Sequence, residues 1–202
     1  PAPFTQYDPE DKLAWMVALT DLDGERLSAT RERLAAAHGD VVAAAGDASS
    51  AADIAEVIVL AEREFGAPVD VYVANAGVGV GADLADEASW ATAIDVNLMA
   101  HVRAAQQLVP GWVERGRGYF VSTASAAGLL TQIGSATYSV SKHGAVAFAE
   151  WLAVTYGDDG VGVGLDDPAL GDLLDRQLVG EPLHLLGGVD AVLLLGGERQ
   201  RC

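Results

Sequence analysis

The chain has 202 residues, 50% of them hydrophobic and 20% charged, which is enough to bury the core of one domain and too few for two large ones. Twelve basic and 29 acidic side chains give a formal net charge of −17, so we expect neither nucleic acid nor an anionic membrane as a partner. A single cysteine, Cys202, excludes an internal disulfide framework, and no apolar run approaches the roughly 20 residues that span a bilayer. These features predict one domain over residues 1–202, located in the cytoplasm.

The first predicted elements conflict near residue 20. Residues 16–20 have the pattern of an opening strand, whereas residues 21–24 have that of the end of another strand and the start of a helix. Parallel neighbouring strands need a crossover of a dozen or more residues, which one peptide bond cannot supply. Either this strand assignment is wrong, or stretches of the natural protein are omitted after Thr20 and, where another strand ends abruptly, near Val163 and Gly164. An intact mass above that of the 202 residues would support the omissions.

Farther along, short apolar runs alternate with longer helical patterns. Strands are predicted over residues 41–45, 69–74, 119–123 and 161–163, and helices over residues 25–38, 50–65, 89–113 and 135–156. Ser50 is the expected cap of the second helix and Gly66 its stop, and Pro110 is expected to loosen the end of the third. Beyond residue 164 the pattern weakens and indicates helix and loop. The alternation favours an α/β fold with a parallel sheet covered on both faces.

The clearest chemical signal is the segment Tyr138-Ser139-Val140-Ser141-Lys142. Four residues apart on one helix face, the phenol of Tyr138 and the ammonium of Lys142 can meet in one pocket. A lysine held near a tyrosine favours the phenolate by Coulomb attraction, as acid/base catalysis requires, although such a pair alone is more often a surface feature. Ser125 strengthens this interpretation, because it lies just after the end of a predicted strand, at the edge where ligands of doubly wound sheets bind.

Several motifs in one order resemble those of the short-chain dehydrogenase/reductase family. They are Asn75-Ala76-Gly77 after a strand, Asn97 within Asp95-Val96-Asn97-Leu98, Ser125, and Tyr138-x-x-x-Lys142. The resemblance covers about residues 21–163, and several motifs in register are more specific than any one of them. It implies a single-domain, Rossmann-type doubly wound parallel sheet with helices on both faces. It also implies hydride transfer between a nicotinamide cofactor and a secondary alcohol or ketone.

The resemblance assigns roles to four catalytic residues. Tyr138 would be the general acid/base, and Ser125 would orient the reacting oxygen. Lys142 would hold the hydroxyls of the nicotinamide ribose. Asn97 would kink its helix and position a water that relays protons to the lysine.

A second set of residues would bind the cofactor along with Tyr138 and Lys142. By resemblance, Asn75-Ala76-Gly77 would line the adenosine side and Asp47 would contact the adenine. Asp21 would choose the cofactor, because a carboxylate at a strand end can accept hydrogen bonds from both ribose hydroxyls and repels a 2′-phosphate, which favours NAD over NADP. The alternative is that Asp21 or Asp23 only caps the following helix.

The largest departure from the family is the glycine-rich loop expected after the first strand. Family members carry Thr-Gly-x-x-x-Gly-x-Gly there, whereas Thr20 is followed by Asp21, and a Pro-Gly segment expected after the sixth strand is also missing. A chain without the loop would bind the cofactor poorly, since the pyrophosphate rests on the helix that follows it. One alternative is therefore a non-catalytic binding or scaffold protein, and another is a relative that epimerises or dehydrates sugars.

The expected partners are a small-molecule alcohol or ketone and further copies of the chain. The resemblance implies a homodimer or homotetramer formed through two long helices, whose small apolar stretches over residues 100–105 and 145–153 allow close packing. Leu129, Leu130 and Ile133 indicate either an apolar pocket wall or core packing. The scattered histidines have no metal-ligand spacing, so no metal site is predicted.

Overall fold

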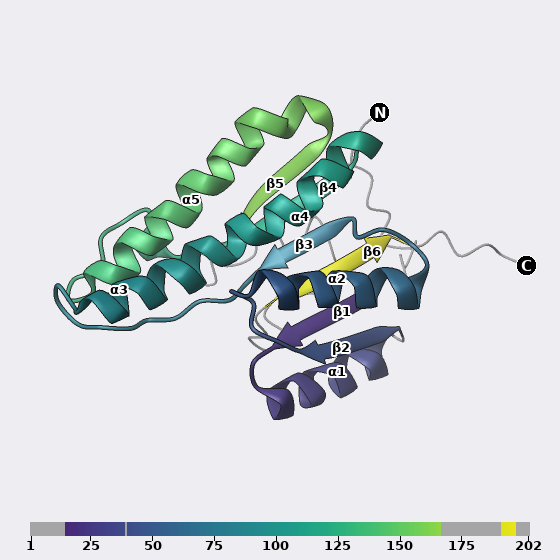
Figure 1. Ribbon diagram of the computed structural model, residues 1–202, viewed down its shortest axis with the longest axis horizontal. Helices are drawn as coiled ribbons and strands as arrows, with labels where there is room; N and C mark the ends of the chain where they lie inside the picture. The colour runs from purple at the N-terminus through teal and green to yellow at the C-terminus, as the bar shows by residue number, and fades with distance from the viewer. Residues whose placement is uncertain (1–14, 39, 167–190, 197–202) are drawn as a thin grey trace, which may run out of the picture.

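A computed structural model of the protein describes residues 15–38, 40–166 and 191–196, in which strands and helices alternate along the chain (Figure 1). The elements are β1 (Trp15–Asp21), α1 (Gly24–His38), β2 (Val41–Ala45), α2 (Ala51–Phe65), β3 (Val71–Ala74), α3 (Glu87–Ile94), α4 (Ala100–Arg115), β4 (Gly118–Thr123), α5 (Ala136–Tyr156), β5 (Val161–Asp166) and β6 (Ala191–Gly196). A π-helical turn, η1 (Asp95–Met99), joins α3 to α4, and 3₁₀ turns lie at Ala126–Gly128 and Gly157–Asp159.

The described strands form one sheet in the order β2-β1-β6-β3-β4-β5. Strand β1 pairs in parallel with β2, and β4 pairs in parallel with β3 and β5. Strand β6 pairs antiparallel with both of its neighbours, β1 and β3. The chain thus winds outward from β1 on one side and from β3 on the other, as in a doubly wound fold, and β6 occupies the switch point between the two halves.

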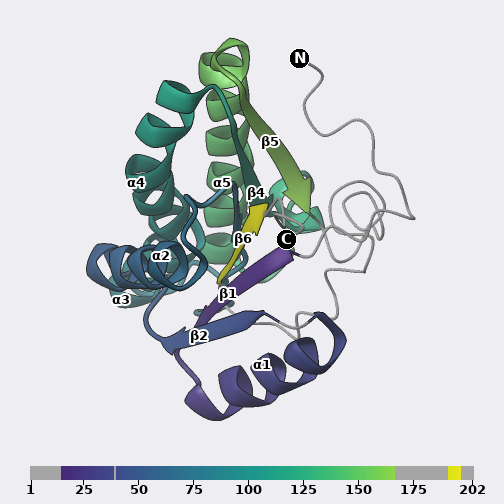
Figure 2. The ribbon, with the colours of Figure 1, turned by 90° about the vertical axis from the view of Figure 1, so that its right-hand side faces the viewer.

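Helices cover both faces of the sheet, as predicted. Ala18, Tyr72 and Phe120 belong to the larger core cluster, which α2, α4 and α5 complete. Figure 2 shows these three helices together on one side of the sheet. The next side chains along the strands, such as Val17 and Val71, point to the opposite face, where α1 contributes to the second cluster.

Two of the helix ends are determined by residues close to them in the sequence. Ser50 caps α2 by accepting a hydrogen bond from the backbone N–H of Asp53 (3.2 Å), and Gly66 ends it in the left-handed conformation with φ 67°, so both predictions are confirmed. The helix predicted over residues 89–113 is divided by η1, and α4 continues through Pro110 to Arg115. None of the described helices has both the length and the apolar composition that crossing a bilayer requires.

Three features of the strand prediction are wrong. Trp15–Asp21 is one strand whose register against β2 runs unbroken to Asp21, so no crossover is needed after Thr20. Strand β5 likewise continues through Val163 and Gly164 to Asp166. Residues 191–196, expected to be helix or loop, form β6. Omission of natural residues at the two junctions stays a prediction that the intact mass would test, and residues 167–190 and 197–202 lie outside the described part.

Candidate active site

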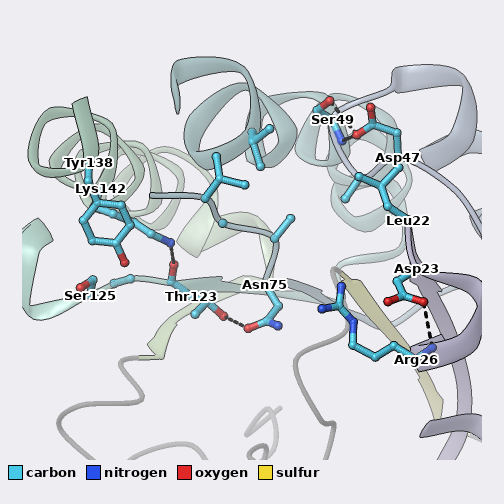
Figure 3. Close-up of a pocket in the computed structure, with 16 residues that line it drawn as sticks. Leu22, Asp23, Arg26, Asp47, Ser49, Asn75, Thr123, Ser125, Tyr138 and Lys142 are labelled. Carbon is cyan, nitrogen blue, oxygen red and sulfur yellow. Dashed lines mark hydrogen bonds between the residues drawn. The ribbon is translucent and has the colours of Figure 1, made fainter. Parts of the chain in front are cut away.

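One cavity of about 680 Å³ lies at the edge of the sheet where β1 to β4 end (Figure 3). Parallel strands bring their carboxyl ends to the same edge, so loops far apart in the sequence meet there. The lining residues are Leu22, Asp23 and Arg26 after β1, Asp47, Ala48 and Ser49 after β2, Asn75, Ala76, Gly77 and Val78 after β3, Thr123, Ala124 and Ser125 at β4, Val96, and Tyr138 and Lys142 on α5.

Tyr138 and Lys142 lie one turn apart near the start of α5 and both line the cavity. The Nζ atom of Lys142 is 6.0 Å from the centroid of the Tyr138 ring. Lys142 is 3% exposed, and its ammonium donates a hydrogen bond to the carbonyl oxygen of Thr123 at 2.8 Å. This bond fixes the amine at the end of β4, where Figure 3 shows it at the same end of the cavity as Ser125 and the Tyr138 phenol.

Ser125 follows β4 in an extended conformation and accepts a hydrogen bond from the backbone N–H of Ala127 (3.2 Å). With Tyr138 and Gly77 it also lines a second cavity of about 550 Å³, whose other walls are Gly79, Gly81, Gln132 and Ser135. The two cavities share Gly77, Ser125 and Tyr138, whereas Lys142 lines only the first.

The apolar residues considered for the pocket wall lie elsewhere. Leu129, Leu130 and Ile133 are 59%, 70% and 98% exposed. They line neither of the two cavities at Tyr138, and their exposure also excludes them from the core.

Asn97 lies behind the cavity wall rather than on it. It is fully buried within η1, and its side-chain amide exchanges two hydrogen bonds with the backbone of Val78, at 2.7 and 3.0 Å. Its Nδ2 atom also donates to the hydroxyl of Ser141 on α5 (2.9 Å). Asn97 lies in the π-helical turn between α3 and α4, which positions it to connect the segment after β3 with α5.

Asp21 is buried and does not line the cavity. Both of its carboxylate oxygens accept hydrogen bonds from Arg26, at 2.6 and 2.9 Å, and one also accepts from the backbone N–H of Asp23 (2.7 Å). The cavity wall at this end is formed by Arg26 and Asp23 themselves. Asp21 therefore does not line the cavity that the other predicted cofactor-binding residues share.

The remaining predicted cofactor-binding residues line the cavity. Asp47 accepts hydrogen bonds from the backbone N–H and hydroxyl of Ser49, at 2.8 and 2.7 Å, which shape the loop after β2. Asn75 accepts a hydrogen bond from the Thr123 hydroxyl (2.9 Å), so the ends of β3 and β4 are tied together (Figure 3). Ala76 and Gly77 follow on the same wall.

The expected glycine-rich loop has no counterpart in the described part of the chain. The central strand, β6, begins at the cavity edge, with Ala191 opposite Thr20 and Ala74, and runs away from it. A strand of this direction cannot deliver a loop and a helix N-terminus to that edge from its carboxyl end.

A buried histidine beneath the site was missed by the sequence analysis. His101 is fully buried on α4, with its Nδ1 atom 3.0 Å from the hydroxyl of Ser122 on β4. Its Nε2 atom has no hydrogen-bond partner in the described part of the chain. Burial, and to a lesser extent the charge of Lys142, lowers the pKa of His101 to about 3, so the ring is neutral.

The fold and the site together define a doubly wound α/β protein with a tyrosine-lysine pair at the edge of the sheet where such folds bind ligands. The model of the short-chain dehydrogenase family matches residues 11–170, and the chain belongs to that family. Among curated proteins, it is 39% identical over 113 residues to a putative ketoacyl reductase of Streptomyces coelicolor, covering 54% of this chain and 43% of that protein. It is 37% identical over 116 residues to an uncharacterised NAD-dependent oxidoreductase of Mycobacterium tuberculosis, covering 55% and 42%.

Solved structures agree on the fold. A short-chain dehydrogenase/reductase from Burkholderia phymatum in complex with NAD superposes with a TM-score of 0.69 at 30% identity, covering 74% of this chain and 55% of that one. A variant of actinorhodin polyketide ketoreductase with NADPH gives a TM-score of 0.69 at 28% identity, covering 73% and 58%. The chain thus spans less than half the length of the two curated relatives.

Proposed function

We propose that the protein is an oxidoreductase that interconverts a secondary alcohol and a ketone with a nicotinamide cofactor. The observation that carries this proposal is the meeting of Tyr138, Lys142 and Ser125 at one end of a cavity that continues along the strand ends. Membership of the family and the curated name of the Mycobacterium relative support it. When bound, the cofactor would supply or accept the hydride.

Tyr138 and Ser125, which line both cavities, would handle the proton. Tyr138 would give its hydroxyl proton to a ketone oxygen, or take the proton of an alcohol in the reverse direction. Ser125 would donate a hydrogen bond to the same oxygen and orient it. Lys142, held by Thr123, would place a positive charge beside the phenol. Asn97 would act indirectly, by holding the backbone of Val78 in place, because its side chain is buried behind Gly77 and Val78.

The two ends of the cavity fit a dinucleotide. A Cβ atom at Gly77 would lie 3.2 Å from the Lys142 Nζ atom, so the absent side chain leaves room for a ligand beside that amine. Lys142 would hold the nicotinamide ribose, and Asn75, Ala76 and Asp47 would line the adenosine side. We propose NAD as the cofactor, since acidic groups at the adenosine end disfavour an added 2′-phosphate.

Replacement of Tyr138 by Phe tests the catalytic proposal. The Y138F variant should lose at least about a hundredfold in kcat, because it lacks the transferable proton, while it still binds NADH. Absorbance of the reduced cofactor, followed over a panel of secondary alcohols and ketones, measures turnover, and NADH fluorescence measures binding. Undiminished turnover by Y138F would overturn the assignment.

The second candidate is a binding or scaffold protein that has lost catalysis. The antiparallel β6 at the sheet centre favours it, because the described residues supply no glycine-rich loop for a pyrophosphate. A folded wild-type chain that gives no enhancement of NADH fluorescence would decide for this candidate.

We also propose that two copies of the chain associate through α4 and α5. An apolar groove of about 590 Å³ lies between these helices and is lined by Val102, Ala105, Gln106, Val109, Pro110, Val113, Phe148, Trp151, Leu152 and Tyr156. Trp151 is 54% exposed there, which is costly for a large aromatic side chain in water. A cytoplasmic location is part of the same proposal, supported by the use of a single cysteine.

A further inference from the structure

We propose that His101 and Ser122 form a positioning pair for Lys142, and thereby fix the end of the cavity that would receive the nicotinamide, a role that rests on the proposed function. Neither side chain lines either of the two cavities at Tyr138. Both are fully buried, and the Nδ1 atom of His101 lies 3.0 Å from the hydroxyl of Ser122. The pair therefore joins α4 to β4 behind the site.

Ser122 lies where the sheet stops holding β4 on both sides. Strand β4 pairs with β3 as far as Ser122, opposite Ala74, and with β5 as far as Thr123, opposite Asp166. Thr123 thus has a paired strand on one side only, and its carbonyl oxygen is the atom that accepts the hydrogen bond from Lys142 (Figure 3). A bond at Ser122 restrains the strand one residue before this carbonyl.

A second buried contact approaches Lys142 from the other direction. Asn97 lies four residues before His101 and donates a hydrogen bond to Ser141, the residue that precedes Lys142 on α5. The segment around the start of α4 is therefore tied to both elements that hold the ammonium, to α5 through Ser141 and to β4 through Ser122. Of these two ties, the one made by His101 and Ser122 acts on the acceptor of the lysine.

The bond to Ser122 is the contribution of His101 that an apolar side chain could not make. Its Nε2 atom has no hydrogen-bond partner among the described residues, and an unsatisfied polar atom in the core costs stability. Its ring lies 6.2 Å from that of Phe120, a contact that an apolar ring would make equally well. Because the imidazole is neutral, it also adds no charge near Lys142.

Two amide variants of His101 separate the bond from the packing. An asparagine amide can reach the position of Nδ1, so H101N should keep the bond to Ser122, whereas a glutamine amide reaches the position of Nε2, so H101Q should lose it. S122A removes the bond from the other side. The shorter side chain of H101N leaves a void and should give a lower thermal midpoint than H101Q. Stability and positioning therefore order the two amide variants oppositely.

The first measurement follows the position of Lys142 without any cofactor. At pH 8, the rate at which an acetylating reagent modifies Lys142 is measured by mass spectrometry. S122A and H101Q should react at least about fivefold faster than wild type, because the amine leaves its carbonyl more often when one hydrogen bond behind it is lost. H101N should stay within about twofold of wild type. Equal rates in wild type, S122A and H101Q would overturn the inference.

The second measurement compares a ligand that reaches Lys142 with one that does not. NADH would extend to the lysine, whereas 5′-AMP would occupy only the adenosine end, near Asp47 and Asn75. S122A and H101Q should each weaken NADH binding about fivefold and leave AMP binding within about twofold of wild type. The double variant H101Q/S122A should be no weaker than either single one, because both remove the same bond. Equal losses for the two ligands would indicate a general loss of structure and contradict the pair.

The control is T30V, which removes a buried hydroxyl on α1, on the opposite face of the sheet. It should change neither the acetylation of Lys142 nor the affinity for NADH. A folded wild-type chain that binds no NADH would overturn the proposed function, whereas the acetylation rates would still decide whether His101 and Ser122 position the lysine. S122A deletes only one oxygen atom, so the test stands even if a variant of His101 does not fold.

Discussion

Gly77 is the residue at which a single added carbon would disturb the candidate site most directly. An alanine Cβ there would lie 3.2 Å from the Nζ atom of Lys142 and 3.5 Å from Oδ1 of Asn97. The lysine would have to move from the carbonyl of Thr123, so we expect G77A to lower kcat/KM at least about tenfold. Steady-state kinetics with the reduced cofactor would measure the change.

Gly157 offers a matched control for that variant. It follows α5, lines neither cavity at Tyr138, and a Cβ at this position meets nothing within 4 Å. G157A should therefore keep its kcat/KM within about twofold of wild type. Equal losses in G77A and G157A would mean that the position of Lys142 is not the cause.

His101 makes the stability of the protein depend on pH. Its pKa is about 3 in the folded state and about 6.5 when unfolded, so below pH 6.5 the unfolded chain binds a proton that the folded chain does not. The stabilisation is complete above about pH 6.5 and is lost as the pH falls toward 3, by up to about 1.4 kcal/mol per pH unit. Urea unfolding at several pH values should show a shallower acid loss for H101Q than for wild type. Parallel curves for the two proteins would contradict this account.

Contacts between residues close together in the sequence were predictable, and contacts between distant residues were not. The Tyr138–Lys142 pair was predictable, because four positions on a helix define one face. The partner of His101 is Ser122, on another element, and nothing near His101 in the sequence announces it. Asp21 and Asp23 are chemically equivalent in the sequence, and only the fold of Arg26 back over β1 makes one of them internal.

At the scale of elements, the cap of α2 is a local device whose strength can be measured. Ser50 accepts from the backbone N–H of Asp53 and donates to its carboxylate at 2.8 Å. The S50A variant should lose about 1 kcal/mol of the free energy of unfolding, because a helix N–H is left without an acceptor. S28A, on the exposed face of α1, should change it by less than about 0.5 kcal/mol. Equal effects in chemical denaturation would exclude the cap as the cause.

Elements bounded by caps and glycines were predictable, and β6 was not. Ser50 and Gly66 mark the two ends of α2 within the sequence itself. The run from Ala191 to Gly196 is apolar and short, and its identity as a strand depends on pairing with β1 and β3, more than a hundred residues away. The sequence analysis wrongly ended a strand at Thr20, because the polar residues at the end of β1 resemble the start of a new element.

At the scale of the whole molecule, the α4–α5 groove predicts a dimer that one charge should dissociate. Burying a glutamate at Trp151 against a second copy would leave a carboxylate without a partner, so W151E should elute as a monomer while wild type elutes as a dimer. Light scattering coupled to size-exclusion chromatography measures the mass. V59E, on the exposed face of α2 and outside the groove, should remain dimeric. A monomeric wild type would end the proposal.

The central position of β6 has a consequence for biosynthesis. The ribosome delivers β1 to β5 first, yet β1 and β3 have no hydrogen bonds to each other and share only the strand between them. Until residues 191–196 leave the exit tunnel, the nascent polypeptide carries two half-sheets, each with an open edge of the kind that recruits other chains. Completion of the sheet thus waits for the synthesis of β6, and during that interval a holding chaperone would have the most to protect.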